Sequence, residues 1–158
     1  MLEWVEKQAL ENLRFHIQTA EQLGKDANAT LTLLLAGVGG MVAYLVKLLE
    51  SKAEVIWLAA VGSFVMTLSV HTAALIFYCL KTAPISAPTN EPRNIYRPYY
   101  SLEVVREVEL DNIQLRIDKV AARNIRVATW LDSIRLMAVC SPISAVAAAV
   151  LCRVLALA

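Results

Sequence analysis

Two long stretches without charge constrain this chain more than any other feature. Residues 27–46 and 55–80 contain no Asp, Glu, Lys or Arg, and they are 20 and 26 residues long. A helix rises about 1.5 Å per residue, so 20 residues span roughly 30 Å, the thickness of a bilayer's hydrocarbon core. Only eight residues separate the two stretches. We therefore predict a transmembrane hairpin.

The composition supports a membrane module with a modest soluble portion. Hydrophobic residues make up 58% of the 158 residues and charged residues 18%, whereas soluble domains are about 45–50% apolar. The net charge of +1 argues against a nucleic-acid partner, because nucleic-acid-binding domains are strongly basic. The three cysteines, Cys79, Cys140 and Cys152, lack metal-ligand spacing. We expect no metal and no cofactor.

A third apolar stretch lies near the C-terminus. Residues 136–152 are uncharged and are flanked by Arg135 and Arg153. Arg153 lies near the end of this stretch, where an arginine can extend to the lipid headgroups. Pro142 is compatible with a membrane helix if neighbouring groups satisfy the carbonyl that it leaves free. We predict a third span over residues 136–158.

The distribution of basic residues predicts the orientation in the membrane. Twelve Lys and Arg residues lie before the first apolar stretch or between the second and third, against three at the hairpin tip and the far C-terminus. The side richer in Lys and Arg is normally the cytoplasmic side. The N-terminus is therefore predicted to be cytoplasmic, in a multi-pass membrane protein that has the first stretch as an uncleaved signal anchor.

Outside the apolar stretches, the spacing of hydrophobic residues predicts two amphipathic helices. Residues 2–24 carry apolar positions three and four apart, and so do residues 102–129, which follow the capping residue Ser101. Each helix is the natural partner for the other's apolar face. The fold is thus predicted to be all-α. Five segments result: an N-terminal cytoplasmic helix (1–26), the hairpin (27–80), a proline-rich connector (81–100), a cytoplasmic helix (101–135) and the third span (136–158).

A row of polar residues marks the second span. Ser63, Thr67 and His71 are four residues apart and share one side of a helix. Ionisable residues inside a membrane are functional candidates, so the row is a candidate lining for a pore or an ion path. The alternative is a set of hydrogen bonds between packed helices, which small polar residues commonly make.

The middle of the first span is rich in glycine. Gly37, Gly39 and Gly40, together with neighbouring alanines, place small residues four apart. Such spacing lets helices approach closely. The close approach would occur either within the hairpin or between subunits of a homo-oligomer, which we predict because one chain offers more apolar helix surface than it can bury.

The connector carries the candidate ligand-sensing residues. Arg93, Tyr96 and Arg97 follow several prolines. Guanidinium groups bind phosphate and tyrosine rings stack on bases, so this segment is a candidate site for an anionic ligand. The alternative is anchoring at the lipid headgroups, where Tyr and Arg are favoured. No nucleophile motif, phosphate-binding glycine loop or zinc pattern is present in the sequence, and we expect no enzymatic activity.

The order of the segments resembles that of small membrane effectors in bacterial antiphage defence. A cytoplasmic helix leads directly into the first span, a tight hairpin follows, and a cytoplasmic helix comes next. The Pycsar transmembrane effectors, and more loosely the SLATT-type two-span effectors, share this layout. In the Pycsar group an Asp-x-Lys-Ala element opens the first span. Here Asp26, Ala27, Asn28 and Ala29 stand in its place, with Asn28 where the group favours lysine.

The resemblance implies a cell-suicide effector in the bacterial inner membrane. Such a protein receives a signal, a cyclic nucleotide or a protein partner, and then oligomerises and depolarises the membrane. The resemblance makes Asp26 and Asn28 candidates for signal sensing. Two other functions stay open: a non-enzymatic membrane anchor that recruits a soluble partner through its cytoplasmic helices, and a phage holin.

Overall fold

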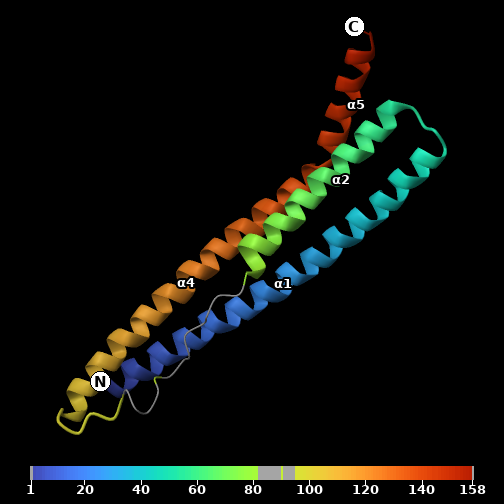
Figure 1. Ribbon diagram of the computed structural model, residues 1–158. Helices are drawn as coiled ribbons and strands as arrows, with labels where there is room; N and C mark the ends of the chain where they lie inside the picture. Colours follow the sequence, from blue (N-terminus) through green and yellow to red (C-terminus); the bar gives the residue numbers. More distant parts are fainter. Residues whose placement is uncertain (1, 82–89, 91–94, 158) are drawn as a thin grey trace. The chain divides into compact units, whose positions relative to one another are not determined.

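The computed structural model describes residues 2–81, 90 and 95–157, and every regular element in this part of the chain is helical. The all-α prediction is therefore confirmed. Figure 1 shows the elements in chain order. They are helix α1 (Leu2–Glu50), helix α2 (Val55–Leu75), the π-helical turn η1 (Ile76–Leu80), helix α4 (Leu102–Cys140) and helix α5 (Pro142–Leu157).

The chain forms two compact units. The first comprises Met1–Gly24 and Thr82–Ala128, and the second comprises Lys25–Lys81 and Thr129–Ala158. The first unit thus contains the N-terminal parts of α1 and α4. The second contains the remainder of both helices together with α2, η1 and α5.

The first unit has a small core between α1 and α4. Leu13 is fully buried, and it forms one cluster with three buried residues of α4, namely Ile113, Ile117 and Val120. These positions recur three and four residues apart, which is the spacing of one helix face. The predicted pairing of the two amphipathic helices is therefore confirmed for this unit.

Polar contacts show that α1 and α4 run in the same direction. Arg106 donates two hydrogen bonds to the Glu6 carboxylate, the shorter at 2.8 Å. The Asn124 amide donates to the His16 carbonyl oxygen, also at 2.8 Å. The paired residues are 100 and 108 positions apart, so sequence number rises along both helices together.

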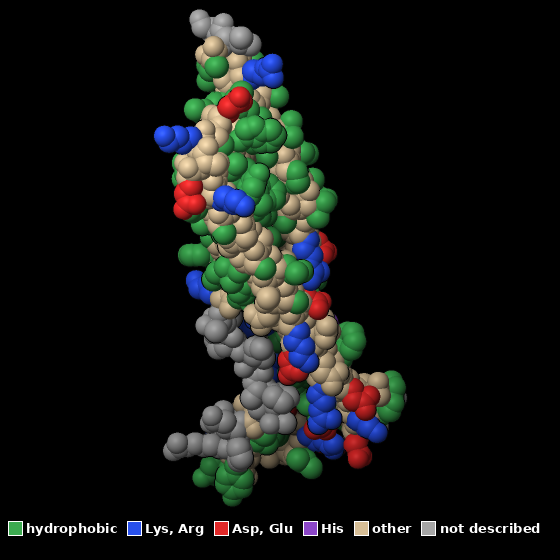
Figure 2. All heavy atoms as spheres, turned by 90° about the vertical axis from the view of Figure 1, so that its right-hand side faces the viewer, with side chains coloured by type: hydrophobic (Ala, Val, Ile, Leu, Met, Phe, Trp, Pro, Cys, Tyr) green, Lys and Arg blue, Asp and Glu red, His purple; other side chains and the backbone are tan. Residues whose placement is uncertain are grey.

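The second unit is apolar on its outside. Both α1 and the continuous helical stretch Val55–Leu80 are long and apolar enough to cross a membrane. Large apolar side chains such as Leu33 and Val70 are mostly exposed in this unit. On the face shown in Figure 2, hydrophobic side chains are numerous over the second unit, with charged side chains toward its hairpin end, and more charged side chains lie over the first unit. Lipid is the solvent that suits such an exterior.

Aromatic side chains mark both ends of the second span. Trp57 is 60% exposed near its start. Tyr78 stacks on Trp130 near its end, with ring centres 4.0 Å apart and planes 4° from parallel. A helix of the intervening length is roughly 30 Å long, and Trp and Tyr are enriched at the two membrane interfaces. This spacing agrees with a bilayer-spanning position for Val55–Leu80.

Two of the predicted segment boundaries, after residue 26 and after residue 135, lie inside continuous helices. The N-terminal amphipathic helix and the first span are one unbroken helix, α1, because Gly24 at their junction lowers helix stability by only about 1 kcal/mol relative to alanine. Likewise α4 continues past Arg135 and ends at Cys140. The predicted third span therefore begins inside α4.

The third span contains a bend of 42° between α4 and α5. Pro142 causes it, because proline lacks the N–H that would bond the Ala138 carbonyl. Ser141 replaces that bond: its hydroxyl donates to the Ala138 carbonyl at 2.7 Å and its N–H at 3.2 Å. The condition under which Pro142 is compatible with a membrane helix is therefore met. Neither helix alone is long and apolar enough to cross a membrane. The bent pair taken together is, and would then form the third span.

The hairpin turn ends α1 with a left-handed residue. Lys52 has a φ of 51°. Its N–H bonds to the Leu49 carbonyl at 3.2 Å, and the Ala53 N–H reaches back to the Leu48 carbonyl at 3.0 Å. This is a Schellman motif, in which glycine is the preferred left-handed residue.

Replacing Lys52 tests this turn. Lys52→Gly should stabilise the hairpin by about 1 kcal/mol, because glycine avoids the steric cost of a left-handed backbone. Lys52→Val should destabilise it by a similar or larger amount. Unfolding of the purified protein in mixed detergent micelles measures both effects, and Lys47→Gly serves as a helical control that should be destabilising. Equal stability of the Gly and Val variants would contradict the motif.

Candidate functional site

The polar row of the second span meets a second polar group on α5. The Ser63 hydroxyl donates to the Ser144 carbonyl oxygen at 3.3 Å. The Thr67 hydroxyl lies 3.0 Å from the Ser144 hydroxyl oxygen and 2.9 Å from the Ser63 carbonyl oxygen. The Ser144 hydroxyl donates in turn to the Ser141 carbonyl at 2.7 Å. Ser63 and Thr67 thus hold α5 against α2.

His71, the third member of the row, lies apart from this contact. Its Nδ1 is 2.6 Å from the Thr67 carbonyl oxygen, a bond within its own helix. Within the part of the chain that the structure describes, Nε2 has no hydrogen-bond partner. The ring therefore keeps one nitrogen that can bind water or a neighbouring subunit. Pore lining by the row as a whole stays a prediction.

The three glycines of the first span have different surroundings. A Cβ added at Gly37 would lie 3.5 Å from a side-chain carbon of Leu68, so Gly37 faces the second span. A Cβ added at Gly39 or Gly40 would meet nothing within 4 Å. Gly37 therefore belongs to packing within the hairpin, and the other two glycines present a bare helix surface.

Asp26 takes part in a polar junction at the start of the first span. Arg135 donates from Nε to the Thr30 hydroxyl at 3.0 Å and from Nη2 to the Asp26 carbonyl at 3.3 Å. The Thr30 hydroxyl, itself buried, donates to the same Asp26 carbonyl at 2.8 Å. This junction ties α4 to α1 through the backbone of Asp26. Asn28 is exposed, and its carbonyl accepts the Thr32 hydroxyl at 3.0 Å.

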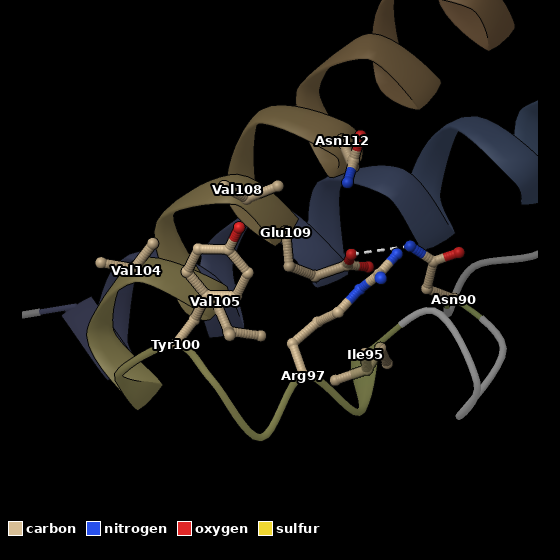
Figure 3. A pocket seen from close by; sticks show the side chains of 9 residues that line it. All are labelled: Asn90, Ile95, Arg97, Tyr100, Val104, Val105, Val108, Glu109 and Asn112. Carbon is tan, nitrogen blue, oxygen red and sulfur yellow. Dashed lines mark hydrogen bonds between the residues drawn. The ribbon is translucent and has the colours of Figure 1, made fainter.

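The first unit contains a cavity of about 600 Å³ at the N-terminal end of α4. This volume is within the usual range for small-molecule sites, roughly 300–1,000 Å³. Figure 3 shows it between the connector and α4. The lining residues are Asn90, Ile95, Arg97, Tyr100, Val104, Val105, Val108, Glu109 and Asn112.

The polar groups of this cavity have distinct roles. Glu109 pairs with the Arg116 guanidinium at 3.6 Å and also accepts a hydrogen bond from Asn90 at 2.9 Å. Arg97 has no ion-pair partner among the described residues, and in Figure 3 its side chain extends into the cavity toward Glu109 and Asn90. The cavity therefore offers an anionic ligand one arginine that forms no ion pair with the described residues, an aromatic ring at Tyr100 and an apolar wall.

The candidate sensing residues of the connector are only partly placed. Arg97 lines the cavity, and it also lines a neighbouring groove of about 540 Å³ together with Tyr96. Arg93 lies outside the described residues. Tyr96 and Arg97 thus lie in one region of the structure. This agrees with the predicted ligand-binding role, which stays a prediction.

Several contributors were missed by sequence reasoning. Ser144, Thr30 and Asn112 each occupy a candidate site, yet no local motif identifies them. Ser144 and Thr30 stand in apolar stretches, where a hydroxyl can equally bond its own helix, as Thr72 does with the Leu68 carbonyl at 2.8 Å. Only their partners on other helices distinguish them.

Thr67 and Ser144 allow a double-mutant test of the α2–α5 contact. Thr67→Val and Ser144→Ala each remove a hydroxyl without adding bulk. We expect a coupling free energy of about 0.6 kcal/mol, the average for hydrogen bonds between membrane helices. Detergent unfolding of the single and double variants measures it. Ser69→Ala is the control for Ser144→Ala, because the Ser69 hydroxyl bonds only within its helix at 2.8 Å. Additive effects at Thr67 and Ser144 would contradict the contact.

Arg97 allows a test of the cavity. Loss of a charged hydrogen bond weakens binding by about 1.5–3 kcal/mol, so Arg97→Gln should lower the affinity for an anionic ligand at least about tenfold. Calorimetry with cyclic nucleoside monophosphates, with inorganic phosphate as competitor, measures the effect. Arg126→Gln, which changes an exposed α4 residue that does not line the cavity, should leave binding unchanged. Equal losses in both variants would indicate nonspecific attraction.

Comparisons of the chain with protein-family models, with curated proteins and with solved structures found no match. Its own residues therefore define the candidate sites: a hydroxyl contact between α2 and α5, an arginine junction between α4 and α1, and a cavity lined by Arg97.

Proposed function

We propose that this protein is a membrane effector of an antiphage, abortive-infection system. It resides in the bacterial inner membrane with its N-terminus in the cytoplasm. On receiving an upstream signal it oligomerises and depolarises the membrane. The observation that carries the proposal is the polar row of Ser63, Thr67 and His71 within an otherwise apolar membrane helix, because polar groups at that depth are costly unless they serve function or packing.

The row combines the two roles that a gated path requires. Ser63 and Thr67 contact α5 through Ser144, so they hold the closed packing of the helices. His71 has a ring nitrogen without a described partner, so it can face water once the helices separate. Opening would replace hydroxyl–hydroxyl contacts by contacts with water, which are similar in energy.

The signal would enter through the first unit. Its cavity holds Arg97, and both helices of that unit, α1 and α4, continue without a break into the second unit. Unbroken helices transmit rotation or displacement better than flexible linkers do. A movement of α4 against α1 would then stretch or break the hydrogen bond from Arg135 to Thr30. A cyclic nucleotide or a protein partner would serve as the trigger.

His71→Leu tests the effector function. In cells that express the protein with its trigger, the parent should arrest growth and depolarise the membrane, as followed with a potential-sensitive dye. His71→Leu should reduce depolarisation at least severalfold at equal membrane abundance. Met66→Leu, an exposed position on the same helix, is the matched control and should behave as the parent. Full activity of His71→Leu would remove His71 from the path.

A second candidate function is a non-enzymatic anchor that recruits a soluble partner. The exposed aromatic residues Trp4 and Phe15 on the first unit favour it, since large apolar patches often mark protein interfaces. An anchor would leave the membrane potential unchanged at every expression level and with every trigger, which separates it from the effector.

A further inference from the structure

Ser141 connects two helices that share no backbone hydrogen bond. Helix α4 ends at Cys140 and helix α5 begins at Pro142. Pro142 has no N–H to donate, and among the described residues no backbone hydrogen bond runs from α5 back to α4. The covalent link between the two helices is therefore a single residue, and the bend of 42° lies at this point.

The hydrogen bonds of Ser141 divide at its own Cα–C bond. Its N–H and its hydroxyl both donate to the Ala138 carbonyl, at 3.2 and 2.7 Å, so this half of the residue belongs to α4. Its carbonyl oxygen accepts the N–H and the hydroxyl of Ser144, at 3.0 and 2.7 Å, so the other half belongs to α5. Rotation about the Cα–C bond, which is the ψ torsion of Ser141, therefore leaves all four hydrogen bonds in place.

The hydroxyl groups between α5 and α2 also have partners in their own helices. The Thr67 hydroxyl lies 3.0 Å from the Ser144 hydroxyl oxygen, but it also lies 2.9 Å from the Ser63 carbonyl oxygen on α2. The Ser144 hydroxyl donates to Ser141. An unpaired hydroxyl in lipid is costly, and neither group would be left unpaired if α5 moved away. Ser63 can then turn to a carbonyl of its own helix, as Ser69 does.

Helix α5 touches the remainder of its unit through one face. Its half-buried residues share this face, because their positions recur at helical spacing. They are Ser144, Ala145, Ala148, Ala149 and Cys152. The large apolar side chains of Ile143, Val146 and Val150 are mostly exposed on the other faces, which suit lipid. Helix α5 thus has a single protein contact to lose, and it remains compatible with the bilayer after losing it.

We propose that α5 is a hinged helix that swings away from α2 by rotation at Ser141. The hydroxyl groups of Ser63, Thr67 and Ser144, here called the latch, hold it in the bent position. Each latch bond is weak, because a hydrogen bond between membrane helices shifts an equilibrium by only about threefold on average. The inference rests on the proposed function for its role, since it names the helix that moves when the effector opens. The swing itself does not require that the membrane be depolarised.

Distances between spin labels on the full-length protein in lipid vesicles test the swing. In a background with the three native cysteines changed to alanine, Val55→Cys on α2 and Val154→Cys on α5 carry the labels at exposed positions. We expect a short distance for the latched helix and a longer one for the released helix. A second pair, Leu49→Cys on α1 with Met66→Cys on α2, reports on the hairpin and should give the same distance in every variant.

Removing the latch hydroxyls of α2 should release α5. Ser63→Ala and Thr67→Val should each raise the ratio of long to short distances about threefold, and together roughly eightfold, because each removes one bond between the helices. The matched control is Ser69→Ala with Thr72→Val, which makes the same chemical changes on the same helix. Those two hydroxyls bond only within α2, both at 2.8 Å, so the control should leave the ratio unchanged.

Pro142→Ala tests the hinge. Alanine restores the missing N–H and is the best helix former, so α4 and α5 can form one continuous helix in which the ψ torsion of Ser141 is fixed. In this background, Ser63→Ala with Thr67→Val should no longer change the distance between Val55→Cys and Val154→Cys. A full response to the lost hydroxyls in this background would overturn the hinge.

The remaining outcomes separate the hinged helix from the effector function. No response to Ser63→Ala with Thr67→Val, or an equal response to the Ser69 and Thr72 control, would overturn the latch. The expected distance changes without any depolarisation of cells would support the hinged helix and contradict the effector function. Depolarisation with unchanged distances would overturn the hinged helix and leave the effector function standing.

Discussion

A backbone in lipid must satisfy its own hydrogen bonds, and the second unit depends on this constraint. Helices meet it, so both uncharged stretches are helical from end to end. The hydroxyl groups obey the same constraint: those of Thr30, Ser69 and Thr72 each donate to the carbonyl four residues earlier. Where proline removes a backbone donor, at the start of α5, a serine supplies the missing bond. Polar contacts between helices are made by the few hydroxyl, carbonyl and guanidinium groups that can form a further hydrogen bond, such as Ser63, Ser144 and Arg135.

The first unit is stabilised in the opposite way. It buries a short row of apolar residues around Leu13 between two helices whose outer faces carry both charged and apolar side chains. Such a seam is small, and it leaves apolar positions and unpaired charges on the outside of both helices. The cavity near Arg97 lies on this unit as well, beside the N-terminal end of α4.

Much of the fold could be predicted from the sequence, because it depends on local patterns. The two uncharged stretches predicted the hairpin. Apolar residues spaced three and four apart predicted the two paired amphipathic helices. The direct passage from the N-terminal helix into the first span was predicted as well, and α1 continues through it because Gly24 weakens a helix without ending it. The sites were less predictable. The row at Ser63 was visible from its spacing, but its partner Ser144 depends on how α5 packs, and the hydrogen bond from Arg135 to Thr30 joins residues 105 positions apart. Whether Gly39 and Gly40 meet another helix depends on molecules outside one chain.

The tight turn at Lys52 bears on how the chain enters the membrane. With α1 ending at Glu50 and α2 beginning at Val55, only four residues connect the two apolar helices. If the two helices cross a bilayer as neighbours, this turn stays on one side of it. The turn and the helix ends beside it carry Lys47, Glu50, Lys52 and Glu54. Two charges of each sign leave no net charge at that end, so the membrane voltage does little net work on it during insertion.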